Sequence, residues 1–155
     1  MKKKLLSLLV AAFLLVLMVS SVSAVDLKNL GVGYYDSGLS IKYALSKELS
    51  VQGILAGGFL GAKANYNLQN NANYNLYGYA KAGATSASFT IGAGAGVEYY
   101  LFKALDLSGP KELKNIAFML DLGLSYTSYK QVSSLYKIEP DIGLDLGIGL
   151  HYYFK

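Results

Sequence analysis

The sequence predicts an all-β fold, namely an eight-stranded antiparallel up-and-down transmembrane β-barrel. The first observation is a long period of two near the C-terminus: the even positions from Ile142 to Phe154 are apolar, and the odd positions from Gly143 to His151 are small or polar. This alternation lasts about twice as long as an ordinary globular strand and is long enough to cross a bilayer. The second is that similar alternation recurs between turn-forming sequences along the chain. The third is that no apolar run after Ala24 is long enough for a membrane-spanning helix.

These observations favour a closed barrel. In lipid every backbone N–H and C=O group must be paired, and an open sheet edge leaves a row of them unpaired. An even number of strands also places both chain ends on one side of the membrane.

Four strands are expected in the N-terminal half of the barrel, at residues 28–35, 39–46, 49–58 and 61–68. Alternation is clearest in the second of these, where the apolar Leu39 and Ile41 flank the polar Ser40. Turn-forming sequences at 36–38, 46–48, 57–61 and 69–71 make the neighbouring strands hairpins. The strand at 61–68 is short, and it could instead join 49–58 as one long strand.

Four further strands are expected at residues 74–84, 88–101, 116–129 and 141–154. In the first of these, Tyr77, Tyr79 and Lys81 share one side. A lysine facing the middle of the bilayer costs roughly 2 to 4 kcal/mol, so this side is expected to face the lumen. Residues 85–87 form a turn, 102–115 a polar linker with a short turn of helix, and 130–140 the longest reversal.

Residues 1–24 predict a secretory signal peptide, and residues 25–155 the barrel domain. A basic start, Met1-Lys2-Lys3-Lys4, is followed by an apolar segment from Leu5 to Val19 and by the small-residue sequence Val22-Ser23-Ala24. The alternative is an uncleaved membrane anchor, since the apolar segment approaches spanning length.

The composition excludes several classes of site. Removing three leader lysines from the 14 basic residues leaves 11, against 10 acidic ones, so there is no basic field to attract nucleic acid and no such partner is expected. The chain has no cysteine, and therefore neither a disulfide framework nor a thiolate metal site. We expect no cofactor and no bound metal.

Two segments resemble the small outer-membrane β-barrel superfamily, which includes the OmpA transmembrane domain, OmpX and OmpW. The segment 91–100, Ile-Gly-Ala-Gly-Ala-Gly-Val-Glu-Tyr-Tyr, resembles a strand of that family, and Gly149, Tyr152 and Phe154 resemble its C-terminal assembly signal, although Lys155 follows the phenylalanine. The resemblance implies an outer-membrane location with periplasmic chain ends. It also implies outer-membrane lipids and the barrel-assembly machinery as partners. We expect a monomer.

Six charged residues on the lumen side form the candidate site: Lys42, Lys63, Lys81, Glu98, Asp121 and Asp145. The lysines come from one wall and the acids from the opposite wall. Because an unpaired buried charge costs several kcal/mol, we expect an ion-pair network that plugs the lumen. Tracing the strands puts Lys63, Lys81 and Asp145 in the outer half and Lys42, Glu98, Asp121 and His151 in the inner half. The alternative is a wet lumen with scattered, solvated charges.

The lumen side also carries many glycines, at positions 92, 94, 96, 123, 143, 147 and 149. The run from Gly92 to Gly96 is not a phosphate loop, because it lies within a strand and no Lys-Ser/Thr follows it. These glycines leave a hollow wall, which either Tyr77, Tyr79 and Tyr100 fill or a small apolar ligand occupies.

Aromatic residues near the strand ends predict two interfacial belts. The outer belt would contain Tyr34, Tyr35, Tyr126 and Tyr129, and the periplasmic belt Tyr43, Tyr99, Tyr152 and Phe154.

The sequence favours a protein without catalysis. His151 is the only histidine, and it has no evident triad spacing. We therefore expect no catalytic residues and an integral outer-membrane barrel with a structural or surface role. The alternative is transport or binding of small hydrophobic molecules through the glycine-lined lumen. A soluble exported lipid-binding barrel is a third possibility, and it would have its apolar face inside.

Overall fold

The structure is a computed structural model that describes residues 27–106, 110–130 and 139–154. It is an all-β, eight-stranded antiparallel closed barrel with sequential up-and-down strand order, which confirms the predicted fold class. The strands are β1 (Leu30–Tyr35), β2 (Gly38–Ala44), β3 (Leu49–Ala56), β4 (Phe59–Asn70), β5 (Tyr74–Ala84), β6 (Ser88–Tyr99), β7 (Ile116–Tyr129) and β8 (Asp141–Tyr153). A short helix, α2 (Leu101–Ala104), and two 3₁₀ turns, η1 (Leu27–Asn29) and η2 (Lys111–Asn115), complete the described elements.

The barrel closes where β1 pairs with β8. Gly31 lies opposite Tyr153 and Tyr35 lies opposite Gly149, and the backbone N–H of Phe154 donates to the carbonyl of Leu30 at 3.0 Å. Every strand therefore has two partners, although β8 extends past β1 at the distal end. We call the end that holds Leu27 and Phe154 the terminal end, and the end that holds the turns at 36–37, 57–58 and 85–87 the distal end.

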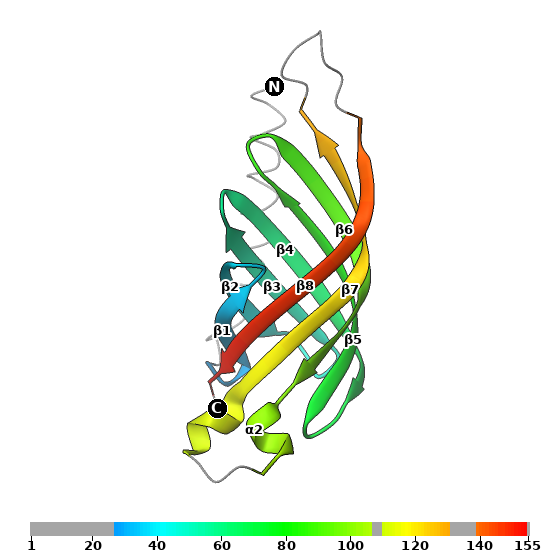
Figure 1. The fold of residues 1–155 in the computed structure, drawn as a ribbon. Helices are drawn as coiled ribbons and strands as arrows, with labels where there is room; N and C mark the ends of the chain where they lie inside the picture. The colour runs from blue at the N-terminus through cyan, green and yellow to red at the C-terminus, as the bar shows by residue number, and fades with distance from the viewer. Residues whose placement is uncertain (1–26, 107–109, 131–138, 155) are drawn as a thin grey trace.

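The wall of the barrel has unequal height. Strands β1 to β3 contain 6, 7 and 8 residues, whereas β4 to β8 contain 11 to 14. Figure 1 shows β6, β7 and β8 extending past β1 to β3 at the end of the barrel away from α2. The long strands supply the acidic side of the candidate site.

Two strands match their predicted ranges, and others differ at their ends. The ranges of β5 and β7 are as predicted, whereas β4 is longer than the expected 61–68 because it pairs with β5 as far as Asn70 opposite Asn75. β6 ends at Tyr99 and the chain then enters α2. Strands β3 and β4 are separate, since Gly57 and Gly58 adopt positive φ angles of 49° and 84° in the turn between them.

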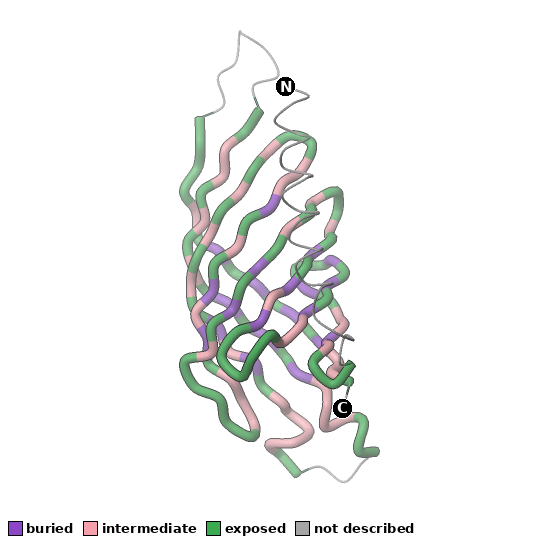
Figure 2. The backbone as a smooth tube through the Cα atoms, turned by 180° about the vertical axis from the view of Figure 1, so that it is seen from behind, coloured by how far each residue is buried: buried purple, intermediate pink, exposed green. Residues whose placement is uncertain are grey.

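The two faces of the wall have opposite character. Large apolar side chains face outward, for example Leu122, Leu146 and Ile148. Buried polar and charged side chains face the lumen: Ser40, Lys42, Ser50, Gln52, Lys63, Asn65, Glu98, Asp121, Asp145 and His151. Figure 2 shows buried and exposed positions alternating along the strands. This polarity is the reverse of the one expected for a soluble lipid-binding barrel, which would have its apolar face inside.

Within the described part of the chain, no helix combines the length and the apolar character needed to span a bilayer. The predicted signal peptide at 1–24, most of the reversal at 130–140, and Lys155 lie outside the described residues.

Candidate functional site

The centre of the lumen is organised around Asp121 on β7. Its carboxylate pairs with the Lys63 ammonium from β4, and it accepts hydrogen bonds from the hydroxyls of Tyr35 and, at 2.6 Å, of Tyr77. All four side chains are fully buried. Period-two alternation explains their position, because each occupies a lumen-facing place on its own strand. The cluster joins β1, β4, β5 and β7 across the barrel.

A second cluster surrounds Glu98 on β6, nearer the terminal end. The Lys42 ammonium lies 3.1 Å from both carboxylate oxygens, the Asn75 amide donates at 3.2 Å, and the Tyr153 hydroxyl donates as well. These groups come from β2, β5 and β8. Lys42 and Glu98 are both buried, so neither charge relies on solvent.

A third cluster surrounds Asp145 on β8, nearer the distal end. The Lys81 ammonium lies 2.5 Å from one carboxylate oxygen, and the Tyr79 hydroxyl donates to the other at 2.7 Å. Each of the three buried carboxylates therefore has one lysine partner and at least one tyrosine hydroxyl. Charge-assisted bonds of this kind are stronger than neutral ones.

The structure thus gathers all six sequence-predicted charged residues into three cross-lumen ion pairs, Lys42–Glu98, Lys63–Asp121 and Lys81–Asp145. Lys63 was expected in the outer half and Asp121 in the inner half, so this pair lies at the level between them. Lys63 and Lys81 are direct cross-strand neighbours in the β4–β5 register. Each lysine lies beside a like charge but reaches across the lumen to an acid.

Aromatic rings surround the central lysine. The Lys63 ammonium lies 4.6 Å from the ring centres of Tyr35 and Tyr79 and 5.1 Å from that of Tyr77. A cation over an aromatic face is stabilised by the quadrupole of the ring, most strongly where water is excluded. The tyrosines therefore stabilise both members of the central ion pair.

The lumen glycines make room for these tyrosine rings. A side chain at Gly96 would meet Tyr77 and Asp121, one at Gly123 would meet Tyr79, and one at Gly147 would meet Tyr35. The expected glycine-lined hollow is thus filled by tyrosine. The third ring that fills it is Tyr35, whereas Tyr100 was the third one predicted. Tyr100 lies beyond the end of β6, with its ring centre 5.9 Å from that of Tyr153.

Assigning Tyr35 to the outer aromatic belt was wrong. It shares the lumen side of β1 with Gly31 and Gly33, and only its neighbour Tyr34 points outward. The same parity places Tyr153 in the lumen on β8. Strand parity in the sequence was therefore the signal that could have identified both residues.

The remaining predicted residues lie near the terminal end. Gly149 faces the lumen beside Tyr35, whereas the rings of Tyr152 and Phe154 contact each other edge to face at 5.4 Å. His151 is buried, and its Nε2 lies 2.9 Å from the Ser40 hydroxyl, to which Gln52 also donates at 2.8 Å. Together, His151, Ser40 and Gln52 line the β2–β3 side of the lumen.

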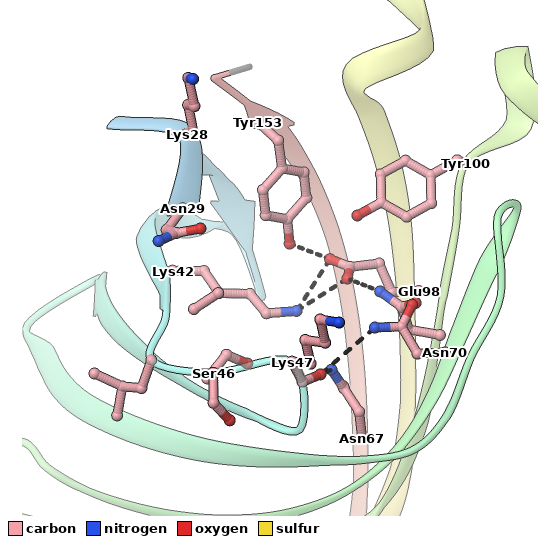
Figure 3. Close-up of a pocket in the computed structure, with 14 residues that line it drawn as sticks. Lys28, Asn29, Lys42, Ser46, Lys47, Asn67, Asn70, Glu98, Tyr100 and Tyr153 are labelled. Carbon is pink, nitrogen blue, oxygen red and sulfur yellow. Dashed lines mark hydrogen bonds and ion pairs between the residues drawn. The ribbon is translucent and has the colours of Figure 1, made fainter. Parts of the chain in front are cut away.

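A hollow opens at each end of the barrel, and the central cluster separates them. The terminal hollow has a volume of about 430 Å³, and Figure 3 shows Lys42, Glu98, Tyr100 and Tyr153 around it. The distal hollow, about 410 Å³, is lined by Asp36, Ile54, Phe59 and Lys81 among others. At the level between them, five lumen side chains are each at most 1% exposed, so water does not reach them: Tyr35, Lys63, Asn65, Tyr77 and Asp121.

Two groups at the hollows lie outside the strands and have shifted pKa values. Burial, and secondarily the nearby Glu98 carboxylate, raise the pKa of the Tyr100 phenol, so it stays neutral and able to donate. Partial burial also raises the pKa of Asp36 at the distal end, although the hydrogen bond from the Ile148 backbone N–H opposes the shift.

Comparison with known proteins does not assign the chain to a family: no family model matches it, and no curated protein matches it either. Among the described residues, there is no group of three or more histidine, cysteine, aspartate or glutamate side chains that could hold a metal ion.

Proposed function

We propose that this protein is an integral outer-membrane β-barrel with a structural or surface role, whose lumen is closed by ion pairs and tyrosine rings. The observation that carries the proposal is the inversion of its two faces. Leucine and isoleucine side chains cover the outside, whereas three lysine–carboxylate pairs lie within the lumen, two of them fully buried. Large exposed apolar surfaces are unfavourable in water but suit the acyl chains of a bilayer.

The outer membrane is proposed as the location for two reasons. The leader at 1–24 predicts export, and the C-terminal strand resembles the signal that the barrel-assembly machinery reads. We propose that machinery and the surrounding outer-membrane lipids as the partners, and a monomer as the assembled state. The terminal end would then face the periplasm.

No catalysis is proposed. The three lumen carboxylates are each engaged by a lysine and a tyrosine, which leaves them poorly placed to exchange protons with a substrate. His151 is fully buried beside Ser40, away from bulk solvent.

Transport of small hydrophobic molecules through the lumen receives less support. The glycine-lined hollow on which that alternative depends is occupied by Tyr35, Tyr77 and Tyr79. A packed interior is the usual arrangement in an eight-stranded barrel, which is just wide enough for its own side chains.

The test is reconstitution of the mature chain into liposomes, followed by gel migration with and without heating and by measurement of ion conductance. We expect the protein to float with the lipid, to migrate faster before heating than after it, and to conduct no steady current. A protein that stays in the aqueous fraction would contradict membrane insertion. A stable conductance would instead support the transport alternative.

A further inference from the structure

The hollow at the terminal end is lined by charged, amide and aromatic side chains, several of which are not needed to close the lumen. Its wall is built from the segment before β1, the β2–β3 turn, the ends of β4 and β5, and the region after β6. Figure 3 shows the Lys42 and Tyr153 side chains converging on Glu98 at its floor. With a volume of about 430 Å³, it falls within the range of small-molecule sites.

The charge of this hollow favours an anion. Three lysines line it, Lys28, Lys42 and Lys47, and Glu98 is the single carboxylate among the described residues of its lining. Because Lys42 already pairs with Glu98, the positive charge available at its mouth is that of the Lys47 ammonium. Lys47 lies there on the exposed β2–β3 turn.

The amides of the hollow favour a ligand with several hydroxyl groups. Four asparagines line it: Asn29, Asn67, Asn70 and Asn75. Asn67 and Asn70 donate their NH₂ groups to the Lys47 carbonyl, at 2.9 and 3.5 Å, and so position the turn that carries this lysine. The Asn75 side-chain oxygen is buried without a hydrogen-bond partner. An unsatisfied buried acceptor favours a ligand that brings a donor.

Two aromatic rings complete the lining. Tyr100 and Tyr153 lie with their ring centres 5.9 Å apart and their planes tilted by 47°. Aromatic faces pack well against the C–H faces of sugar rings, and their hydroxyl ends can bond to polar substituents. The distal hollow differs, because its lining includes Ile54, Ala56 and Phe59 and no asparagine.

We propose that the terminal hollow binds a sugar that carries a carboxylate. In this arrangement the Lys47 ammonium meets the carboxylate, the asparagine amides meet the hydroxyls, and the Tyr100 ring lies against the sugar ring. Glu98 and Lys42 remain paired and form the floor. This binding role goes beyond the structural role proposed above, and its failure would leave the membrane barrel unaffected.

The first experiment titrates the folded mature protein in detergent micelles with glucuronate, glucose and acetate, using ligand-observed NMR. We expect glucuronate to bind about tenfold more tightly than either glucose or acetate, since only glucuronate presents both a sugar ring and a carboxylate. Equal affinity for acetate and glucuronate would reduce the effect to general attraction of anions and overturn the proposal. Absence of glucuronate binding would overturn it as well.

The second experiment compares two lysines at the same end of the barrel. Lys47→Gln removes a charge from the lining, whereas Lys111→Gln removes one from the exposed η2 turn, which does not line the hollow. We expect the first change to weaken glucuronate binding about tenfold, to the level of glucose, and the second to leave it unchanged. An equal loss in both variants would show that net charge alone is responsible. Heat-dependent gel migration checks that both variants fold.

The third variant tests the aromatic contact. Tyr100→Leu keeps an apolar side chain beyond the end of β6 but removes the ring. We expect it to weaken glucose and glucuronate binding alike and to leave acetate unaffected. Undiminished binding of both sugars would exclude the Tyr100 ring as a contact and contradict the proposed arrangement.

Discussion

Lys63 and Asp121 form an ion pair across the centre of the lumen, 58 residues apart in the sequence and both fully buried. The hydroxyls of Tyr35 and Tyr77 each donate a further hydrogen bond to Asp121, one to each carboxylate oxygen. A buried pair of this kind contributes little net stability compared with an apolar pair of similar volume, but removing one partner is costly because the other charge stays buried.

We therefore predict that Asp121→Asn lowers the free energy of unfolding by about 3–5 kcal/mol, since the Lys63 charge loses its partner. The double variant Lys63→Met/Asp121→Asn should recover most of the loss, because no buried charge remains and the asparagine oxygen can still accept from tyrosine. Urea titration in lipid vesicles would measure both. A double variant as unstable as the single one would mean that the charge is not the cause.

The exposed pair Lys114–Asp106 offers a matched control. Its atoms lie 3.1 Å apart, but the side chains are 39% and 92% exposed. Asp106→Asn should change stability by less than about 1 kcal/mol. A comparable loss at both sites would argue for a general charge effect.

A second prediction concerns the space that glycine leaves for tyrosine. A Cβ atom at Gly147 would overlap the Tyr35 ring, which is buried and bonded to Asp121. Gly147→Ala should therefore destabilise the barrel by about 1–3 kcal/mol, the usual cost of overpacking. At the outward-facing Gly53 the nearest atom lies 4.0 Å away, so Gly53→Ala should be neutral or slightly stabilising. If both variants unfold at the parent's urea midpoint, the Tyr35 ring can move aside for the added methyl group, and the lumen around Gly147 is not tightly packed.

The sequence could predict the faces of the barrel because a period of two does not depend on how strands are paired. Parity alone assigned Lys42, Glu98 and Asp145 to the lumen. Parity does not give the depth at which side chains from opposite walls meet, since that depends on the stagger of the closed sheet. The alternation in the sequence therefore could not predict which carboxylate each lysine would pair with.

Two errors have specific physical causes. Gly61 suggested a turn, but it lies within β4, where its missing side chain accommodates the ring of Phe59. Tyr35 was assigned to the outer belt from its residue type and its place near a strand end, although the parity of β1 directs it inward. Its hydrogen bond to Asp121 spans 86 residues and has no local signal.

A third prediction concerns pH. Asp36 lies in the β1–β2 turn with φ of 49°, and its carboxylate accepts from the Ile148 N–H at 3.1 Å. Partial burial raises its pKa and outweighs the hydrogen bond from Ile148 and the charge of Lys81, which lower it, while Asp145 and Asp121 raise it further. The folded state thus binds the proton more tightly than the unfolded chain. The resulting stabilisation is complete below the unfolded-state pKa and is lost as the pH rises through the folded-state value.

Asp36→Asn should remove this pH dependence. Asparagine tolerates the positive φ angle and keeps an oxygen for the Ile148 N–H, but it cannot ionise. We expect the variant to match the parent under acidic conditions and to exceed it in stability at neutral pH. Unfolding midpoints measured across both ranges would test this, and two parallel pH curves would contradict it.

The last prediction tests the outward face itself. Leu146 on β8 lies opposite Leu122 in the β7–β8 register and is 60% exposed, near the middle of the apolar wall. A lysine there would face the centre of the bilayer at a cost of roughly 2–4 kcal/mol, so Leu146→Lys should reduce the fraction of protein that folds into liposomes. Leu105 is similarly exposed, at 56%, but lies beyond α2 and outside the wall, so Leu105→Lys should fold like the parent. Because both variants replace a leucine by a lysine, any difference between them comes from the position of the residue. If Leu146→Lys folds into lipid as efficiently as Leu105→Lys, the apolar rows do not contact acyl chains and the membrane proposal fails.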